Sequence, residues 1–338
     1  IGSTPVQSMR EDEAVASIKD ALHSVDRRFF AHLSNNGKLC GLSDGPAAGA
    51  VEVPACNLGN LSKDAAAFMR AYGCNAPLYT GAMAKGIASA DLVCAAGKAG
   101  ILASLGAGGL PLGSPTVTRP NTVESCLDQI QRELKRGEPF AVNLIHSPFD
   151  DLLERGCVEI LLRRSVRVIE ASAFMTLTKH VVRYRVAGLR RRSDGSVECQ
   201  NKIIFKVSRT ELAEMALRPA PDHLLKKLLE EGLITPEQAQ MSKEVPMCDD
   251  IAVESDSGGH TDNRPFHVIY PLIARLRDRV CRELGFTNER RVRVGVGGGI
   301  GCPESVLAAF SMGAAFVVTG SVNQMAKQAG TVDQVRKV

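Results

Sequence analysis

Glycine is concentrated in one segment near the carboxyl end of the chain, Arg291-Val-Arg-Val-Gly-Val-Gly-Gly-Gly-Ile-Gly-Cys-Pro303. An apolar run leads there into three consecutive glycines, residues 297–299, and Pro303 and Glu304 then begin a predicted helix. Because glycine has no side chain, the backbone can approach a ligand closely, and free N–H groups before a helix bind phosphate. The segment is a candidate phosphate site, and a tight structural turn is the alternative.

Two common nucleotide-binding motifs do not match this segment. A dinucleotide fingerprint that starts at Gly295 and Gly297 requires glycine at position 300, where the sequence has Ile300. The chain also lacks the Gly-Lys-Ser/Thr of a Walker motif.

A second polar segment, Glu254-Ser-Asp-Ser-Gly-Gly-His-Thr-Asp-Asn-Arg-Pro265, contains a histidine after two glycines. Gly258 and Gly259 would let the backbone pass under a flat ring and leave the imidazole of His260 over it. Histidine is also the side chain whose unperturbed pKa best suits proton transfer near neutrality. We therefore take His260 as the candidate catalytic residue, with a purely structural histidine as the alternative.

Eight short apolar runs alternate with amphipathic helices and would position these segments. The predicted strands are Leu78–Met83, Gly100–Leu105, Pro139–Ile145, Val166–Ala171, Lys202–Val207, Asp250–Glu254, Arg291–Val296 and Ala315–Thr319. The helices between them include Ser89–Lys98, Thr122–Arg136, Phe266–Leu284 and Pro303–Met312. This alternation predicts an α/β fold, a closed (β/α)₈ TIM barrel with a parallel sheet. In such barrels the loops after strands seven and eight bind phosphate, which here are the glycine segment and Gly320-Ser321.

The remaining parts of the chain are predicted to be peripheral. Residues 1–70 form an N-terminal segment with a helix over Glu11–Arg28 and a loop over residues 34–50, and residues 71–338 form the barrel. The barrel carries two insertions, a β-hairpin within residues 172–200 and a helical piece at 219–246. The arms of the hairpin are predicted at Val181–Gly188 and Val197–Lys202, around the turn Ser193-Asp194-Gly195.

Composition excludes several classes of protein. Of 338 residues, 44 % are hydrophobic and 23 % charged, as in an ordinary globular protein. The longest apolar stretch, Ala99–Gly113, is interrupted by Pro111, so we expect no membrane span. A net charge of +4 and the absence of Trp argue against nucleic acid. The ten cysteines form no Cys-x-x-Cys pair, which predicts no metal site and free thiols in a cytoplasmic protein.

The glycine and histidine motifs resemble those of the nitronate monooxygenase and flavin-dependent enoyl-reductase superfamily, whose members are FMN-binding (β/α)₈ barrels. Three longer motifs, Tyr79–Ser89, Lys206–Arg209 and Ser257–Pro265, resemble more closely the enoyl-reductase subunit or domain of polyunsaturated fatty-acid synthases. The resemblance covers about residues 52 to 328. Asp256 and Ser257 stand where the shorter superfamily motif has Glu-Ala, which weakens an assignment to nitronate oxidation.

The resemblance implies roles for individual residues. The flavin ring would lie along Gly81, Ala82 and Met83, with Asn143 at its polar edge. Lys206 would place a cation near N1 of the reduced flavin, and a structural lysine is the alternative. Gly298, Gly299, Gly320 and Ser321 would hold the FMN phosphate, and Gly258 and Gly259 would also contact the cofactor. Asp262 and Asn263 would contact the substrate, and His260 would orient the thioester carbonyl or donate a proton.

The implied function is an FMN-dependent enoyl reductase that uses NADPH or NADH to reduce trans-2-enoyl chains on acyl carrier protein. A nitronate monooxygenase (2-nitropropane dioxygenase-like) and a non-catalytic scaffold barrel of a synthase are the alternatives. The resemblance leaves a homodimer open and implies a further helical segment beyond Val338. Acyl carrier protein is acidic, so it could dock on the arginines at positions 163, 164, 183, 185 and 190–192. The same arginines could favour the NADPH 2′-phosphate, or form an ordinary solvated face.

Overall fold

The computed structural model describes residues 28–33, 39–45, 50–53, 62–117, 119–256 and 261–336. The chain divides into two compact units, Ile1–Lys63 and Asp64–Val338. This division falls before the boundary of 70/71 expected from the sequence, because helix α2 (Lys63–Tyr72) crosses that boundary. Most of the helix expected over Glu11–Arg28 and much of the loop expected over residues 34–50 lie outside the described residues.

The first unit contains a small antiparallel sheet. Its strands are β1 (Phe29–Leu33), β2 (Leu39–Ser43) and β3 (Val51–Val53), in the order β2-β1-β3.

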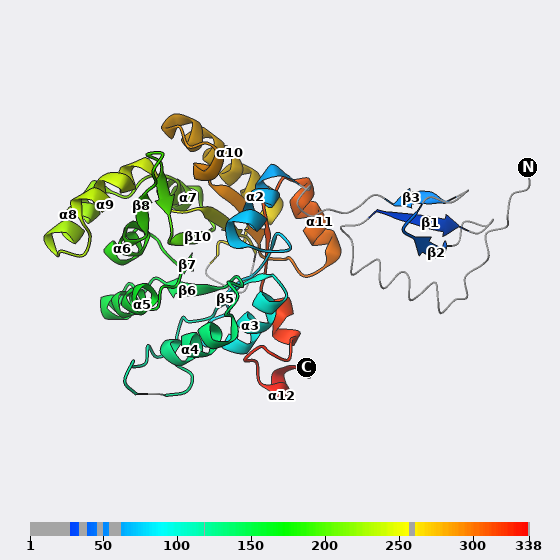
Figure 1. The fold of residues 1–338 in the computed structure, drawn as a ribbon, viewed down its shortest axis with the longest axis horizontal. Helices are drawn as coiled ribbons and strands as arrows, with labels where there is room; N and C mark the ends of the chain where they lie inside the picture. Colours follow the sequence, from blue (N-terminus) through cyan, green and yellow to red (C-terminus); the bar gives the residue numbers. More distant parts are fainter. Residues whose placement is uncertain are drawn as a thin grey trace, which may run out of the picture. The chain divides into compact units, whose positions relative to one another are not determined.

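The second unit is a closed barrel of eight parallel strands with helices around it (Figure 1). The barrel strands are β4 (Leu78–Thr80), β5 (Leu102–Leu105), β6 (Ala141–Ile145), β7 (Val168–Ser172), β10 (Lys202–Val207), β11 (Asp250–Glu254), β12 (Arg293–Gly297) and β13 (Val317–Thr319). Each barrel strand pairs with the barrel strands that precede and follow it in the sequence, and β13 closes the barrel on β4. The predicted α/β barrel is therefore confirmed, and each of its eight predicted strands overlaps an observed one.

Helices follow most of the strands. Their bounds are α3 (Ala90–Lys98), α4 (Val123–Glu133), α5 (Asp151–Arg163), α6 (Lys179–Ala187), α7 (Thr210–Leu217), α8 (Asp222–Glu230), α9 (Pro236–Met241), α10 (Phe266–Leu284), α11 (Pro303–Ser311) and α12 (Asp333–Arg336). Short 3₁₀ turns lie at Ser242–Glu244 (η2), Asn288–Arg290 (η3) and Ser321–Met325 (η4). Side chains start several helices, as where Thr122 accepts a hydrogen bond from the Ser125 amide. Among the described residues, no helix is long and apolar enough to span a membrane.

The prediction of the first hairpin arm is wrong. Val181–Gly188 lies mostly in helix α6, and the hairpin consists of β8 (Leu189–Arg191) and β9 (Val197–Cys199). The run of β-branched residues favours a strand, but the Thr178 side chain caps the helix by accepting from the Val181 amide. Burial of Val181, Val182, Tyr184 and Val186 then outweighs the weak local preference.

The barrel interior is apolar in its middle and charged at its amino end. Buried side chains from six strands fill the middle: Tyr79, Leu102, Ala141, Ile204, Ala252 and Val318. Helix α2 covers the amino ends of the strands, where Phe68 stacks on Phe316 at 4.4 Å between ring centroids. The Tyr72 hydroxyl donates to Asp250, and Asp250 pairs with Arg293 at 2.6 Å. The amino end of the barrel is therefore closed by packed aromatic rings and a buried ion pair.

Candidate active site at the carboxyl end of the barrel

The glycine segment after β12 forms a loop whose shape requires glycine. Gly298 and Gly299 have φ angles of +91° and +70°, which residues with a side chain rarely adopt. A Cβ at Gly298 would lie 2.7 Å from Ser255 Oγ, whereas a Cβ at Gly299 would meet no heavy atom within 4 Å. Ser255 donates to the Gly297 carbonyl at 2.5 Å and so fixes the loop to the end of β11. The loop is held by the protein on one side and open on the other.

Gly320 and Ser321 lie at the same end of the barrel as this loop. Strands β12 and β13 run parallel, with Gly297 opposite Val318, so the segments that follow them are neighbours. A Cβ at Gly320 would meet no heavy atom within 4 Å, and Ser321 is exposed. Two open backbone segments side by side leave room for a phosphate group, so the residues present fit the phosphate of FMN.

The segment Gly81–Met83 follows β4 and is fixed by hydrogen bonds to β13, to β7 and to the loop that continues from it. The Gly81 amide donates to the Thr319 carbonyl at 2.9 Å, and the Ala82 amide donates to Glu170 Oε2 at 3.0 Å. The Met83 carbonyl accepts from the Ala88 amide at 3.1 Å. This backbone segment therefore has a defined position at the barrel mouth.

Asn143 and Lys206 reach the same mouth from β6 and β10. Asn143 Nδ2 donates to the Glu170 carbonyl and to Ser172 Oγ, both at 3.0 Å. Lys206 Nζ lies 2.9 Å from Glu254 Oε1 and 3.5 Å from Glu170 Oε1. Burial alone would lower the pKa of Lys206, but Glu170 and Glu254 outweigh it and raise that pKa above its ordinary value. Lys206 is therefore a charged ammonium group held by two carboxylates.

Sequence reasoning missed both of these carboxylates. Glu170 lies in the middle of β7 and Glu254 at the end of β11, and both are buried. The sequence did hold a signal for both residues. Glu170 is the charged residue of the run Val168–Ser172, and Glu254 ends a predicted strand and opens the polar segment that contains His260.

Gly258, Gly259 and His260, together with Ser257, lie outside the described residues, so their predicted positions stay predictions. The residues after them are placed at the mouth: Thr261 Oγ1 donates to the carbonyls of Glu254 and Ser255 at 3.0 and 2.8 Å. Asp262 pairs with Arg209 at 2.8 Å, and the hydrogen bond from Arg209 lowers the pKa of Asp262. Asn263 is exposed next to it.

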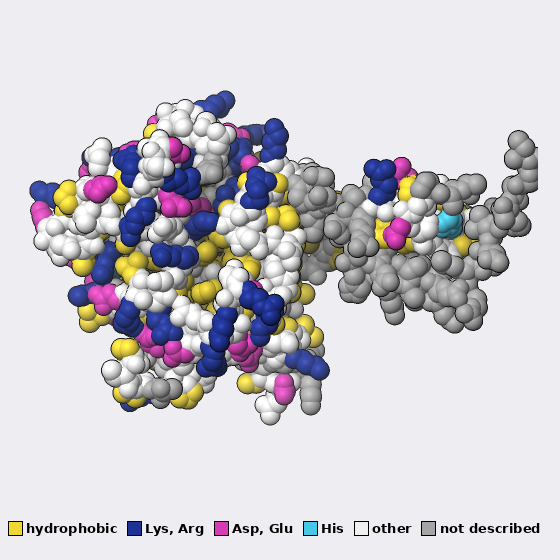
Figure 2. Space-filling model, viewed as in Figure 1, with side chains coloured by type: hydrophobic (Ala, Val, Ile, Leu, Met, Phe, Trp, Pro, Cys, Tyr) yellow, Lys and Arg dark blue, Asp and Glu magenta, His cyan; other side chains and the backbone are white. Residues whose placement is uncertain are grey.

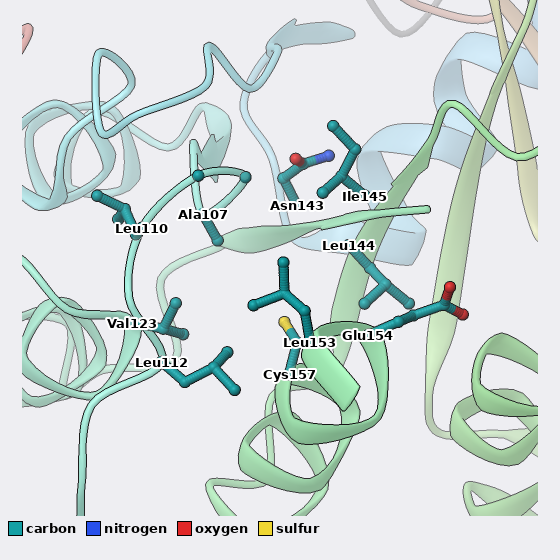
Figure 3. A pocket seen from close by; sticks show the side chains of 12 residues that line it. Ala107, Leu110, Leu112, Val123, Asn143, Leu144, Ile145, Leu153, Glu154 and Cys157 are labelled. Carbon is teal, nitrogen blue, oxygen red and sulfur yellow. The ribbon is translucent and has the colours of Figure 1, made fainter. Parts of the chain in front are cut away.

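A pocket lies beside β6 (Figure 3), with about 300 Å³ of space between its lining atoms, part of it open to solvent. The side chains of Leu112, Val123, Leu153 and Cys157 face it from the helix side of β6, whereas Asn143 and Ile145 point to the other side of that strand (Figure 3). The pocket therefore belongs to the space between barrel wall and helices.

The Glu154 carboxylate is the charged group at this pocket. It accepts from Thr178 and lies 3.0 Å from Nδ1 of His146. Glu154 is thus a buried carboxylate that is separate from the pair around Lys206.

Most of the arginines expected to form a docking surface lie at the other end of the barrel, and Arg183 lies in the middle of α6. Arg163 and Arg164 end α5, and β8 and β9 precede the start of β10, so both groups are at the amino ends of the strands. Most of them pair with acids: Arg163 with Glu124, Arg164 with Asp128, Arg183 with Glu159, Arg191 with Glu244 and Arg192 with Glu198.

Arg185 in this group is buried and bonds to Asp249 at 2.6 Å. On the face drawn in Figure 2, Lys and Arg are interspersed with Asp and Glu over the barrel unit. These arginines therefore form no separate basic surface at the mouth.

The geometry defines the class of the protein, a (β/α)₈ barrel with a polar site at the carboxyl ends of its strands. No family model matches the chain. Two polyunsaturated fatty acid synthase subunits of Thraustochytrium sp. are similar to it, one 56 % identical over all 338 residues and the other 59 % identical over 322 residues. The chain spans 22 % and 15 % of the length of those two relatives.

Two solved structures are also similar to this chain. The enoyl reductase domain of MlnA from the macrolactin cluster of Bacillus amyloliquefaciens is 34 % identical with a TM-score of 0.74, over 80 % of this chain and 59 % of that one. FabK from Thermotoga maritima, at 19 % identity and a TM-score of 0.51 over 80 % of this chain and 66 % of that one, shares the fold. The chain is thus similar over 95–100 % of its length to segments of these synthase subunits, and over 80 % of its length to the MlnA enoyl reductase domain.

Proposed function

We propose that this chain is an FMN-dependent enoyl reductase that reduces trans-2-enoyl chains bound to acyl carrier protein, with NADPH or NADH as reductant. The observation that carries the proposal is the likeness to the enoyl reductase domain of MlnA, at 34 % identity and a TM-score of 0.74. The open backbone at Gly299 and Gly320, at the end where such barrels bind phosphate, supports FMN as the cofactor.

Residues of the chain have separate tasks in this proposal. The segments around Gly298 and Gly320 bind the phosphate, and Ser321 adds a hydroxyl. Gly81, Ala82, Met83 and Asn143 would orient the ring, and we propose that Gly258 and Gly259 also contact it. When bound there, FMN would supply the hydride chemistry that connects the nicotinamide with the β-carbon of the enoyl thioester.

Protein groups near the reacting atoms complete the reaction. Lys206 supplies a fixed positive charge, because two carboxylates hold its ammonium group. His260 orients the thioester carbonyl or donates the proton that the α-carbon takes up. Asp262 and Asn263 line the entry of the substrate.

The Thraustochytrium relatives also suggest partners. Because both are subunits of a polyunsaturated fatty acid synthase, we propose that carrier domains of such a synthase deliver the substrate. The buried cysteines Cys94, Cys157 and Cys248 are free thiols, which supports a cytoplasmic location.

An absorption spectrum followed by an anaerobic titration tests the reaction. We expect a yellow protein whose flavin absorbance is bleached by NADPH and recovers on addition of a crotonyl thioester. Recovery only with oxygen, together with turnover of a nitroalkane, would instead indicate a nitronate monooxygenase. A protein that binds no flavin after incubation with FMN would contradict the proposal and favour a scaffold.

Stopped-flow measurement of the two half-reactions tests His260. His260→Ala should leave FMN bound and its reduction by NADPH unchanged, because that step needs no protein acid. Reoxidation by the enoyl thioester should slow by roughly 10²–10⁴-fold if His260 is the general acid. A small loss with weaker substrate binding would indicate carbonyl orientation, and unchanged reoxidation would remove His260 from the mechanism.

A further inference from the structure

Glu170 is a completely buried carboxylate to which the proposed function has so far given no task. Its exposed fraction is 0 %, and it points into the barrel interior from β7. A buried carboxylate is costly unless hydrogen bonds and an opposite charge compensate for the lost water. The groups around Glu170 are therefore informative about its role.

Each oxygen of the Glu170 carboxylate faces a different set of partners. Oε2 accepts from the Tyr79 hydroxyl and, at 3.0 Å, from the Ala82 amide. Oε1 lies 3.5 Å from Lys206 Nζ and 3.4 Å from Ser172 Oγ. Ala82 and Lys206 are both candidate flavin contacts, so one carboxylate connects two parts of the proposed flavin site.

The backbone of the same residue holds a third candidate contact. In the parallel register of β6 and β7, Asn143 lies opposite Glu170, and its side-chain amide donates to the Glu170 carbonyl at 3.0 Å. Ala82, Asn143 and Lys206 therefore share Glu170 as a common partner, although they come from three different strand ends.

The charges of this group do not cancel. Glu170 and Glu254 are two carboxyl groups beside the one ammonium group of Lys206, so these three side chains together carry one net negative charge when all of them are ionised. Because the site is buried, this charge is screened less than it would be at a surface.

We propose that Glu170 is a positioning residue of the flavin site, which fixes the Ala82 amide and the Lys206 ammonium group and makes the cluster around them net negative. The inference rests on the proposed function, because it takes FMN as the group that occupies the mouth. A net negative charge disfavours the negatively charged reduced flavin and so lowers its midpoint potential. Glu170 thereby makes the reduced flavin a stronger hydride donor.

The variant Glu170→Gln tests this inference. Glutamine keeps the shape and one acceptor oxygen for Tyr79 and Ala82 but removes the charge. At a fixed solution potential we expect the ratio of reduced to oxidised flavin to rise about tenfold, since a nearby charge changes such equilibria by about one power of ten or more. For a two-electron couple this is a rise of about 30 mV in the midpoint potential, measured by equilibration with a redox dye.

Two further variants keep the test decisive. Glu254→Gln removes the other carboxylate of the cluster and should raise the potential in the same direction, which covers the case in which Glu170→Gln does not fold. Glu154→Gln is the matched control: Glu154 is also buried, at 2 % exposed, and its carboxylate also has two side-chain partners, His146 and Thr178. Glu154 lies on the helix side of β6, so the flavin midpoint potential of the Glu154→Gln protein should equal that of the wild type.

The outcomes separate this inference from the proposed function. If the wild type and the variants bind FMN and their potentials agree, the inference is overturned and the proposed function stands. Reduced thermal stability of Glu170→Gln with an unchanged potential indicates a purely structural carboxylate and overturns it as well. A wild-type chain that binds no FMN overturns the proposed function, and this inference with it.

Discussion

Replacing Gly320 tests ligand binding at the candidate phosphate site more directly than replacing Gly298 or Gly299 does. Gly298 and Gly299 have positive φ angles, so a side chain at either position strains the backbone even without a ligand. Gly320 has a φ of −130°, and a Cβ there would meet no protein atom within 4 Å. A change at Gly320 therefore affects the ligand more than the fold.

We expect Gly320→Ala to weaken FMN binding by about tenfold, or about 1.4 kcal/mol, because the new methyl group occupies space that the phosphate needs. Fluorescence titration of the apoprotein with FMN measures the affinity, and a melting curve checks the fold. Gly45→Ala is the control, since a Cβ at Gly45 is also unobstructed and Gly45 lies in the first unit. Equal affinities for all three proteins would remove Gly320 from the phosphate site.

The residues of the site differ in how visible they were in the sequence. Gly298 and Gly320 stand in motifs: the positive φ of Gly298 favours glycine, and the open space at Gly320 fits the phosphate that we propose there. Glu170 stands in the segment Val-Ile-Glu-Ala-Ser, which matches no motif. Its importance depends on the register of β6, β7 and β10, which sets Asn143 and Lys206 beside it. Such contacts between distant strands cannot be derived from spacing along the chain.

Helix α2 is the element that closes the amino end of the barrel, and Phe68 is its central contact. The Phe68 ring is fully buried, stacks on Phe316 at 4.4 Å and contacts Tyr72 at 4.8 Å between centroids. We expect Phe68→Ala to lower the free energy of unfolding by about 3–5 kcal/mol, because it removes a large buried side chain and leaves a cavity. Chemical denaturation measures this loss.

The same variant should bind FMN with unchanged affinity below its melting temperature, because the candidate site lies at the opposite end of the strands. Arg70→Ala, at an exposed position of the same helix, is the control and should change stability by less than about 0.5 kcal/mol. A Phe68→Ala protein as stable as the wild type would show that α2 does not close the barrel in solution.

Most elements were predictable because helix and strand periodicity is local. The strands Lys202–Val207 and Asp250–Glu254 agree with their predicted bounds, since each is a short apolar run between turn residues. The strand predicted over Val181–Gly188 was wrong because its conformation is not decided locally. Three valines favour a strand there, but the packing of α6 on the barrel favours the helix.

At the scale of the whole molecule, the two ends of the barrel separate the arginines from the candidate site. Arg191 and Arg192 pair with Glu244 and Glu198, and all the hairpin arginines lie at the amino ends of the strands. We therefore expect the triple replacement of Arg190, Arg191 and Arg192 with Ala to leave the rate with carrier-bound enoyl substrate unchanged. Steady-state rates at low and high salt measure this, because steering by charge fades with salt.

A small thioester analogue is the comparison substrate for this triple variant, because it needs no docking of a carrier domain. A selective loss with the carrier-bound substrate at low salt would place the docking surface on the hairpin after all. In that case the carrier would have to reach the mouth around the outside of the barrel.

The apolar middle of the barrel also has a consequence for where protons travel. Tyr79, Leu102, Ala141, Ile204 and Ala252 separate the charged amino end from the polar mouth, and all five are buried. A layer of buried and mainly apolar side chains disfavours a continuous file of water molecules, so we expect the floor of the mouth to be closed to protons from below. If the proposed function holds, we expect the proton that the saturated product gains to enter through the mouth, which the substrate also uses. In heavy water, the deuterium incorporated at the α-carbon would then arrive by a single route, shared with the acyl chain itself.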